Sequence, residues 1–240
     1  MTTPGATRLM DALEATWPPR ATDTRDGWRL RDGAGGGKRV SAAVALSDGA
    51  DIAVAEDAMR ARGARPLFQL TQDHVALDAA LAGKGYRMLD PSLIYVAPCA
   101  DLARKPPRVS LFDIWPPLAI MVDLWAEGGI GPDRLAVMNR ACTPHTGFVA
   151  RIDDRAAGVA FAAIHDGIAM VHAIEVAAHM RRKGLGSIVL RGVGHWAHAQ
   201  GAEWLALAVA ETNSGARALY EGSGMRVAAR YHYREEEDRA

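Results

Sequence analysis

Cysteine is scarce in this chain, because its 240 residues include only two, Cys99 and Cys142. They do not have the spacing of metal ligands, and such low cysteine usage favours a reduced compartment over a disulfide framework. The eight histidines form no zinc-binding pattern either. We therefore expect no metal site, and we expect neither cysteine to act as a nucleophile.

A charge excess of either sign is also absent, since 28 Lys and Arg residues balance 28 Asp and Glu residues. A neutral chain argues against a surface that coats nucleic acid, so any anion site must be local. No apolar run approaches the roughly 20 residues that cross a bilayer, and the first residues do not have the pattern of a signal peptide. These absences predict a cytoplasmic protein that binds neither nucleic acid nor a membrane. The abundance of alanine, arginine and glycine is typical of a GC-rich bacterial genome.

The chain does contain a glycine-rich basic turn, Arg181-Arg182-Lys183-Gly184-Leu185-Gly186, between an apolar strand and a helix. The glycines leave backbone N–H groups open to an anion, and the helix N-terminus adds about half a positive charge. This pattern predicts a phosphate-binding site. It does not favour a P-loop nucleotide site, because the Gly-Lys-Ser/Thr ending and a paired Asp for Mg²⁺ are missing.

Hydrophobic periodicity predicts a mixture of helices and strands. The expected helices span 9–17, 51–62, 73–83, 117–125, 133–142, 184–200 and 213–221. The expected strands span 27–30, 38–45, 66–70, 87–96, 147–153, 156–165, 168–176, 203–210 and 225–233. The polar glycine run 33–37 is interpreted as a flexible hairpin tip rather than a phosphate loop, because no helix is predicted directly after it. Residues 235–240 are expected to form a frayed, charged tail.

Two segments of the chain resemble each other weakly at an offset of 139 residues, 72–86 and 211–225. Each follows a predicted strand and then continues as helix, glycine and strand, which suggests two copies of one unit. The proline-containing stretch 101–109 is predicted as a linker, so the expected domains are 1–100 and 110–240. The first copy has no counterpart of the glycine-rich basic turn, and we expect it to be structural or to face the substrate.

The second half resembles the GNAT superfamily of acyl-CoA-dependent N-acyltransferases. The residues that carry the resemblance are Arg181-x-x-Gly184-x-Gly186 and, about thirty residues later, Asn213, Ala216, Leu219-Tyr220 and Gly224-Met225. The resemblance implies a mixed α/β sheet whose two central parallel strands splay apart into a V-shaped slot. It also implies acetyl-CoA as co-substrate, with no metal.

The N-terminal half resembles, less specifically, the degenerate partner of tandem GNAT proteins. The pattern is Gly27-Trp28-x-Leu30-Arg31, followed by a glycine-rich turn and the basic pair Lys38-Arg39. This resemblance implies two tandem units that share or abut their sheets.

The same resemblance implies which residues hold the cofactor. The pantetheine arm would pair with strand backbone around Val176, and the pyrophosphate would rest on the amides of residues 182–186. The cofactor-binding residues implied are Ile174, Val176, Arg181, Arg182, Lys183, Gly184, Leu185, Gly186, Asn213, Ala216 and Tyr220. For Asn213, its position at a strand-to-helix junction also predicts an N-cap, and the two roles are compatible.

Two residues are candidates for catalysis. Tyr220 would protonate the leaving thiolate, against the alternative that its ring only packs on the sheet. Glu175 is a carboxylate within an apolar strand, which is costly unless it is paired or faces a wet cleft. It is therefore our preferred general base, against the alternative of a solvent-facing position. His172 would project from the opposite face of a regular strand and is interpreted as a packed imidazole.

Some members of the family place a glutamate in the next strand, at the position that is Ala208 here. A mechanism with a general base at that position is therefore not expected. Glu211 is nearby but is interpreted as a surface loop residue. The predicted function is acetyl transfer from acetyl-CoA to a primary amine of a small molecule or peptide, by direct attack in a ternary complex. The alternative is a non-catalytic acyl-CoA-binding sensor or interaction module. Exposed strand edges would allow a homodimer.

Overall fold

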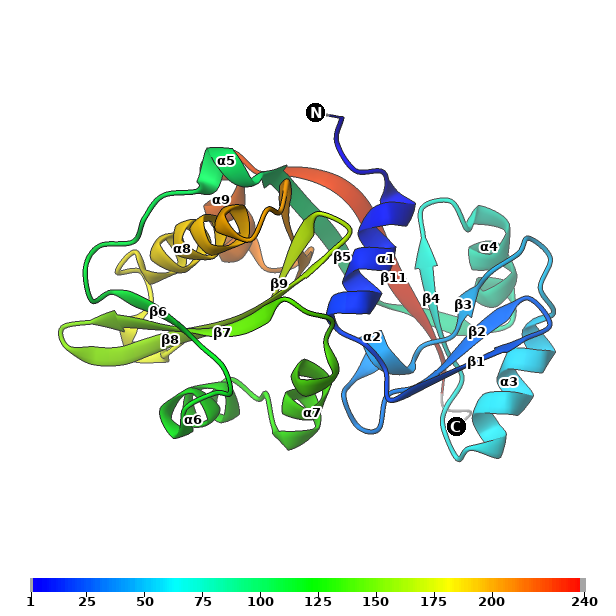
Figure 1. Cartoon of the computed structure of the whole chain (residues 1–240). Helices are drawn as coiled ribbons and strands as arrows, with labels where there is room; N and C mark the ends of the chain where they lie inside the picture. Colours follow the sequence, from blue (N-terminus) through cyan, green and yellow to red (C-terminus); the bar gives the residue numbers. More distant parts are fainter. Residues whose placement is uncertain (1, 238–240) are drawn as a thin grey trace.

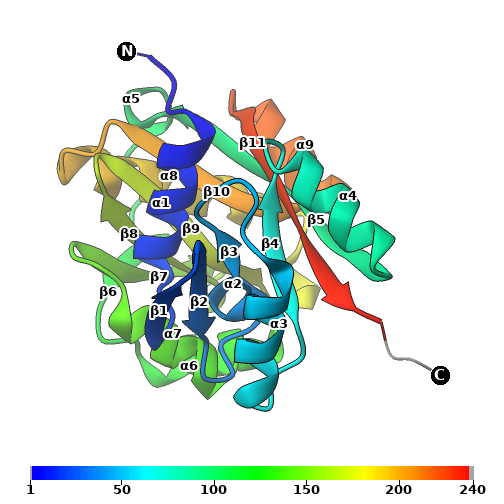
Figure 2. The same ribbon diagram turned by 90° about the vertical axis from the view of Figure 1, so that its right-hand side faces the viewer.

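One eight-stranded mixed sheet runs through the molecule, beside a small sheet of three strands, in the computed structural model, which describes residues 2–237 (Figures 1 and 2). The large sheet has the order β4-β11-β5-β10-β9-β8-β7-β6, and the small one β1-β2-β3. The strands are β1 (Ala21–Arg25), β2 (Trp28–Asp32), β3 (Val44–Ala45), β4 (Leu67–Thr71), β5 (Tyr86–Pro98), β6 (Leu111–Ile114), β7 (His145–Ile152), β8 (Arg155–His165), β9 (Ile168–Val176), β10 (Trp204–Ala210) and β11 (Arg226–Glu236). The mixed α/β fold class predicted from the sequence is confirmed.

Helices cover both faces of the large sheet (Figure 1). They are α1 (Ala6–Thr16), α2 (Lys38–Ser41), α3 (Ile52–Ala61), α4 (Val75–Gly83), α5 (Cys99–Leu102), α6 (Ala119–Glu127), α7 (Pro132–Arg140), the 3₁₀ turn η1 (Ala178–Met180), α8 (Leu185–Ala199) and α9 (Ser214–Gly222). Among the described residues, no helix is both long and apolar enough to span a membrane.

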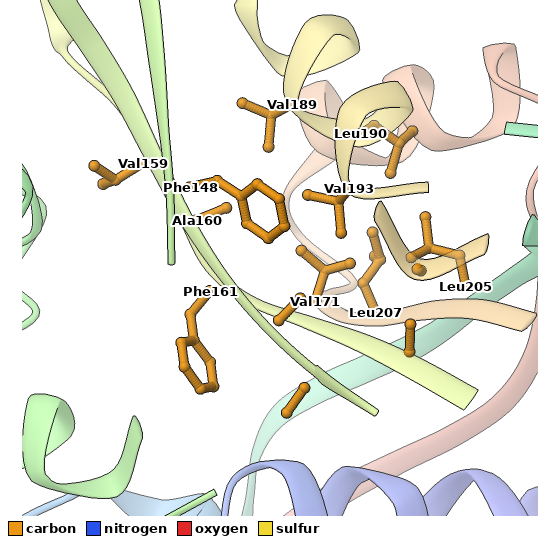
Figure 3. Close-up of a cluster of buried hydrophobic side chains, with 14 of the residues drawn as sticks. Phe148, Val159, Ala160, Phe161, Val171, Val189, Leu190, Val193, Leu205 and Leu207 are labelled. Carbon is orange, nitrogen blue, oxygen red and sulfur yellow. The ribbon is translucent and has the colours of Figure 1, made fainter. Parts of the chain in front are cut away.

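The main core lies between α8 and the centre of the sheet. Val189 and Val193 of α8 face Val171 and Leu207 on one side of the sheet, whereas Phe161 points to the other side (Figure 3). Strand β8 is buried along nearly its whole length because α8 packs on one face and α1 and α6 pack on the other. This double burial explains why its sequence is continuously apolar instead of alternating.

The two segments that resemble each other in sequence lie in two strand–helix–strand units, β4-α4-β5 and β10-α9-β11. Shifting α4 by 139 residues gives 214–222, which are the bounds of α9, and Gly85 and Gly224 have similar φ angles of +88° and +85°. The strand register repeats as well, because the pair Thr71–Tyr231 of β4 and β11 corresponds to the pair Ala210–Ser92 of β10 and β5.

The last strand of each unit lies inside the other unit. Strand β11 pairs with β4 and β5, and β5 pairs with β11 and β10, all antiparallel. One sheet therefore crosses the predicted boundary between 1–100 and 110–240, which remain predicted domains.

The predicted strand 38–45 is wrong. Its first residues form the short helix α2, and only Val44 and Ala45 pair as β3. Gly37 has a φ of +96°, which lets the chain turn into α2, and Ser41 Oγ donates to the Gly37 carbonyl oxygen over 3.0 Å. The hairpin of this region is instead β1–β2, whose tip is at Asp26 and Gly27.

The glycine run 33–37 is not a hairpin tip, because it is packed against α7. A Cβ added at Gly36 would lie 2.6 Å from Val137, and one at Gly35 would lie 2.4 Å from Asp133 Oδ2. The absence of side chains thus allows the close approach of this turn to α7.

Two boundary predictions also need correction. The linker predicted at 101–109 begins inside α5, where Leu102 packs closely against Gly194 of α8, so the irregular connection starts at Ala103. The predicted tail begins inside β11, because Glu235 and Glu236 pair with Arg87 and Tyr86. Residues 238–240 of that tail lie outside the described residues.

Candidate active site

The site begins where two neighbouring strands separate. Strands β9 and β10 pair in parallel only from Ile168–Trp204 to Val171–Leu207, and then continue apart to Val176 and Ala210. A cavity of about 420 Å³ lies at this divergence, and we call it the slot cavity. The unpaired edges of the two strands leave backbone groups available to a ligand.

A β-bulge in β9 decides which side chains enter the slot cavity. His172 pairs with Phe161 and Glu175 with Val159, so Ala173 and Ile174 together oppose a single residue of β8. Ala173 has a φ of +51°, and its carbonyl oxygen accepts a hydrogen bond from Trp125 Nε1 over 2.9 Å. The extra residue places His172 and Glu175 on the same face of the strand.

The expectation that His172 and Glu175 project from opposite faces is therefore wrong, because β9 is not a regular strand. Both residues line the slot cavity. What separates their chemistry is their hydrogen bonding.

Glu175 is a partly buried carboxylate that packs against the C-terminal end of α6. A Cβ added at Gly128 would lie 2.5 Å from Glu175 Cγ, so only glycine leaves room for this side chain. Burial raises the pKa of Glu175, and the positive charges of Arg181 and Arg134 oppose the rise only in part. A carboxylate of raised pKa beside a cavity is suited to accept a proton.

His172 is held neutral by its partners. The Thr16 hydroxyl donates to the Ala12 carbonyl oxygen over 2.6 Å, so it accepts from His172 Nε2 over 2.8 Å. Arg39 can only donate, so His172 Nδ1 accepts from its Nη1 over 3.2 Å. Burial, and then the charge of Arg39, lower the pKa of His172 well below its usual value. The lone pair on Nδ1 already accepts a hydrogen bond from Arg39, so His172 has no lone pair left to take a proton. This fits the predicted packed imidazole rather than a general base.

Tyr220 reaches the slot cavity from α9 and is 6% exposed. Its ring packs on Tyr95 with the centroids 5.6 Å apart, and burial raises the pKa of its phenol to about 12. The hydroxyl therefore stays protonated at neutral pH. Asn213 caps the same helix by accepting from the Ala216 amide over 3.1 Å, which confirms the predicted N-cap.

The turn 181–186 presents free backbone amides at the start of α8. The amides of Ser187 and Ile188 bond to the Gly184 carbonyl oxygen. The five amides of residues 182–186 make no hydrogen bond within the described part of the chain. Gly184 adopts a φ of +85° in open space, so the turn has the conformation that glycine favours.

The side chains of this turn have different surroundings. Leu185 is buried and anchors the turn in the core, whereas Arg181, Arg182 and Lys183 are exposed. Arg181 Nε donates to the Val176 carbonyl oxygen over 3.1 Å, which ties the turn to the end of β9. Cationic side chains and free amides therefore gather at the end of β9, beyond the residues of this strand that line the slot cavity.

The N-terminal half supplies lining residues that sequence reasoning missed. Residues 36–39, from the glycine turn and α2, line the slot cavity. Trp17, the residue that follows α1, and Asp90 of β5 line it as well. The sequence shows the basic pair Lys38-Arg39, but the strand predicted at 38–45 gives no sign that this pair reaches the slot cavity.

Metal and cysteine chemistry find no support in the geometry. Among residues 2–237, no cluster of His, Cys, Asp and Glu could hold a metal ion. Cys99 and Cys142 are free thiols, and burial raises the pKa of both, that of Cys99 to about 12. Neither is therefore a thiolate at neutral pH.

Comparison with known proteins agrees with this geometry. Residues 117–225 match the acetyltransferase (GNAT) family. This segment is similar to the GNAT acetyltransferases. The matched residues run from just before α6 to just before β11 and include β9, β10, the turn 181–186 and α9.

Relatives extend the similarity over the whole chain. The uncharacterized N-acetyltransferase YobR of Bacillus subtilis is 26% identical over 232 residues, covering 92% of this chain and 94% of that protein. A GCN5-related N-acetyltransferase from Kribbella flavida has the same fold, with a TM-score of 0.75 at 18% identity over 99% of this chain and 98% of the other. A tandem GNAT protein of the clavulanic acid biosynthesis pathway gives a TM-score of 0.56 at 16% identity, covering 78% of this chain and 69% of its own. Family, relative and fold support an acyltransferase.

Proposed function

We propose that the protein transfers the acetyl group of acetyl-CoA to a primary amine bound in the slot cavity. The observation that carries this proposal is the row of five free amides at residues 182–186, next to the unpaired edge of β9. Amides at a helix N-terminus suit a diphosphate, and the nearby Arg and Lys side chains add charge-assisted bonds. The open strand edge suits the amide groups of a pantetheine arm, which would reach Ile174 and Val176.

The proposed chemistry uses two side chains that line the slot cavity, Glu175 and Tyr220. Glu175 takes a proton from the ammonium group of the acceptor, and the neutral amine attacks the thioester carbon. A backbone N–H near Val176 stabilises the oxyanion that forms. The attack forms the C–N bond, and collapse of the tetrahedral intermediate breaks the C–S bond. Tyr220 gives its proton to the leaving thiolate, and the second proton lost by the acceptor nitrogen restores the phenol. Holding both reactants in one slot contributes much of the rate gain.

The alternative is an acyl-CoA-binding sensor without catalysis. It is favoured by Ala208, which lines the slot cavity at the position where some relatives place a glutamate. The buried phenol of Tyr220 and the carboxylate of Glu175 in the same cavity favour catalysis instead.

One experiment separates these two functions. Calorimetry measures acetyl-CoA binding to the full chain, and a thiol reagent measures CoA release with a panel of primary amines. We expect binding together with amine-dependent release. Binding without release from any amine would favour the sensor, and the absence of binding would contradict both functions.

We also propose that the N-terminal half is a degenerate GNAT unit, with domains 1–100 and 110–240 sharing one sheet. The support is a parallel bridge between Ala43 and Phe68. Phe68 corresponds, at the 139-residue offset, to Leu207, which forms the last parallel pair before β9 and β10 separate. Beyond this bridge lies a second cavity of about 390 Å³, lined by β3, β4 and α1. Residues equivalent to the turn 181–186 are missing there. A cytoplasmic location and a homodimer remain predictions.

A further inference from the structure

One part of the slot-cavity wall comes from the N-terminal half. Lys38 and Arg39 of α2 line it, together with Arg134 of α7. The close packing of the glycine run on α7 holds α2 in this position, because a side chain at Gly36 would collide with Val137. A surface formed by both halves therefore carries three positive side chains.

Arg39 has no carboxylate partner among the described residues, unlike Arg29 and Arg31. Its Nη1 bonds to His172 Nδ1 and its Nη2 lies 3.4 Å from the Tyr231 hydroxyl. Its Nε is buried without any partner. By contrast, Arg29 and Arg31 share Glu14 at 3.1 and 3.5 Å.

The remaining charges on the wall do not neutralise Arg39. Lys38 forms an ion pair with Asp90 over 3.0 Å, so these two cancel. The other acidic lining residue is Glu175, which forms no ion pair with Arg39 in the described part of the chain. A guanidinium that is largely desolvated and has an unused N–H is costly unless an anion completes its bonding. The missing anion can come from the ligand.

The spacing of the site suits a ligand that carries both an amine and an anion. His172 and Glu175 lie on one face of β9 and are two register positions apart, which is roughly 6.6 Å along a strand. Arg39 contacts His172, so an anion at Arg39 and an amine at Glu175 would be separated by only a few atoms.

We propose that the acceptor is an amino acid, an amine with a carboxylate a few atoms away, and that Arg39 binds this carboxylate. The inference rests on the proposed acetyl transfer for its reaction, and it goes further by naming the acceptor class and the residue that selects it. The guanidinium fork matches a carboxylate, and Nη1 and Nη2 each carry a second N–H beyond the bonds to His172 and Tyr231. The amine then points toward Glu175 and the thioester.

The test compares acceptors that differ only in the carboxylate. Glycine, β-alanine, γ-aminobutyrate and L-phenylalanine are each paired with their carboxamides. CoA release gives kcat/KM for each member with the full chain. For at least one pair we expect kcat/KM of the carboxylate compound to be tenfold or more above that of its carboxamide. In Arg39→Met this ratio should fall toward one, and Arg39→Lys should restore part of it.

A second measurement does not depend on turnover. The same eight compounds are titrated by calorimetry into protein saturated with CoA. Carboxylates should bind at least tenfold more tightly than amides, and Arg39→Met should remove the difference. CoA affinity of the Arg39→Met variant reports that it is folded. Arg29→Met is the matched control, because Arg29 pairs with Glu14 and does not line the slot cavity, so the ratio should persist.

The outcomes distinguish this inference from the proposed function. CoA release that is equal for carboxylates and amides overturns the inference and leaves acetyl transfer standing. Arg39-dependent carboxylate binding with no CoA release supports the ligand class and contradicts acetyl transfer. If CoA binds but no compound of the panel binds or reacts, the inference is overturned.

Discussion

At the scale of single residues, burial sets the protonation state of both proposed catalytic groups. It raises the pKa of the Glu175 carboxyl and of the Tyr220 phenol. For the acid, Tyr220, this keeps the proton available at assay pH. For the base, Glu175, it increases the affinity for a proton, which helps only where the pH still leaves the carboxylate ionised.

Tyr220→Phe should lower kcat by about 100-fold, the scale of one lost general acid, while acetyl-CoA affinity changes little. The hydroxyl makes no hydrogen bond to the described residues, so its removal should leave the free energy of unfolding nearly unchanged. CoA release and calorimetry measure the two effects. Tyr95→Phe, which keeps the neighbouring ring and removes only its hydroxyl, is the control. A variant that keeps its kcat would contradict the proposed acid.

Glu175→Gln should lower kcat about 100-fold and flatten the acid limb of the pH–rate profile, which follows ionisation of this carboxyl in the wild type. Its effect on stability has the opposite sign. Since the folded protein binds this proton more tightly than the unfolded chain, wild-type stability is lost as pH rises through the raised pKa.

Glu175→Gln should therefore be at least as stable as wild type at pH 7, and the difference should vanish near pH 4. Urea unfolding at the two pH values measures this. Glu127→Gln on the exposed end of α6 is the control and should keep both the rate and the acid limb. Loss of stability at pH 7 on replacing Glu175 would argue that the carboxylate is stabilised by a partner.

At the scale of elements, the ends of α8 offer a matched pair of glycines. Gly184 precedes the helix with a φ of +85°, Gly201 follows it with a φ of +84°, and both face open space. A glutamate at either position should cost about 1 kcal/mol through backbone strain. Only Gly184→Glu places negative charge beside the five free amides, so it alone should raise the Kd for CoA by tenfold or more.

Calorimetry with CoA and urea unfolding of both variants test this prediction. Equal CoA affinity in the two variants would mean that the turn 181–186 does not hold the diphosphate. If both variants lose the same free energy of unfolding but only Gly184→Glu binds CoA more weakly, the weaker binding does not come from backbone strain.

Local sequence signals were sufficient for elements that depend on neighbouring residues. The cap at Asn213, the stop at Gly224 and the apolar spacing of α9 were all readable. The bulge at Ala173 was not, because alanine gives no sign of a positive φ. The bulge depends on pairing with β8 and on Trp125, far away in the sequence. The prediction that His172 projects from the opposite strand face to Glu175 was therefore wrong. The prediction of a strand in place of α2 was wrong too, because the position of α2 depends on packing against α7.

At the scale of the whole molecule, the repeat was visible but the exchange of last strands was not. An offset in sequence shows that two units are alike, whereas the choice of strand partners depends on long-range hydrogen bonds. Sharing of the sheet places Arg39 and Asp90 of one half in the slot cavity of the other. The N-terminal half is thus part of the candidate site.

Residues 110–240 alone should not form a stable monomer. Without β5, the facing edges of β10 and β11 are unpaired, and the buried side chains of Leu93, Ile94 and Tyr95 leave the core. We expect aggregation or a loss of cooperative unfolding, measured by gel filtration and thermal circular dichroism beside the full chain. A monomeric fragment with a cooperative transition would show that the predicted domains are separable.

The exposed connection between α5 and β6 carries none of this pairing. Each half donates its long strand to the other, so the two are interlocked by backbone hydrogen bonds as well as by covalent continuity. A break in the backbone near Arg104 would leave these interlocked strands in place. The molecule would persist as a two-piece complex, and its slot would survive the loss of the covalent bridge.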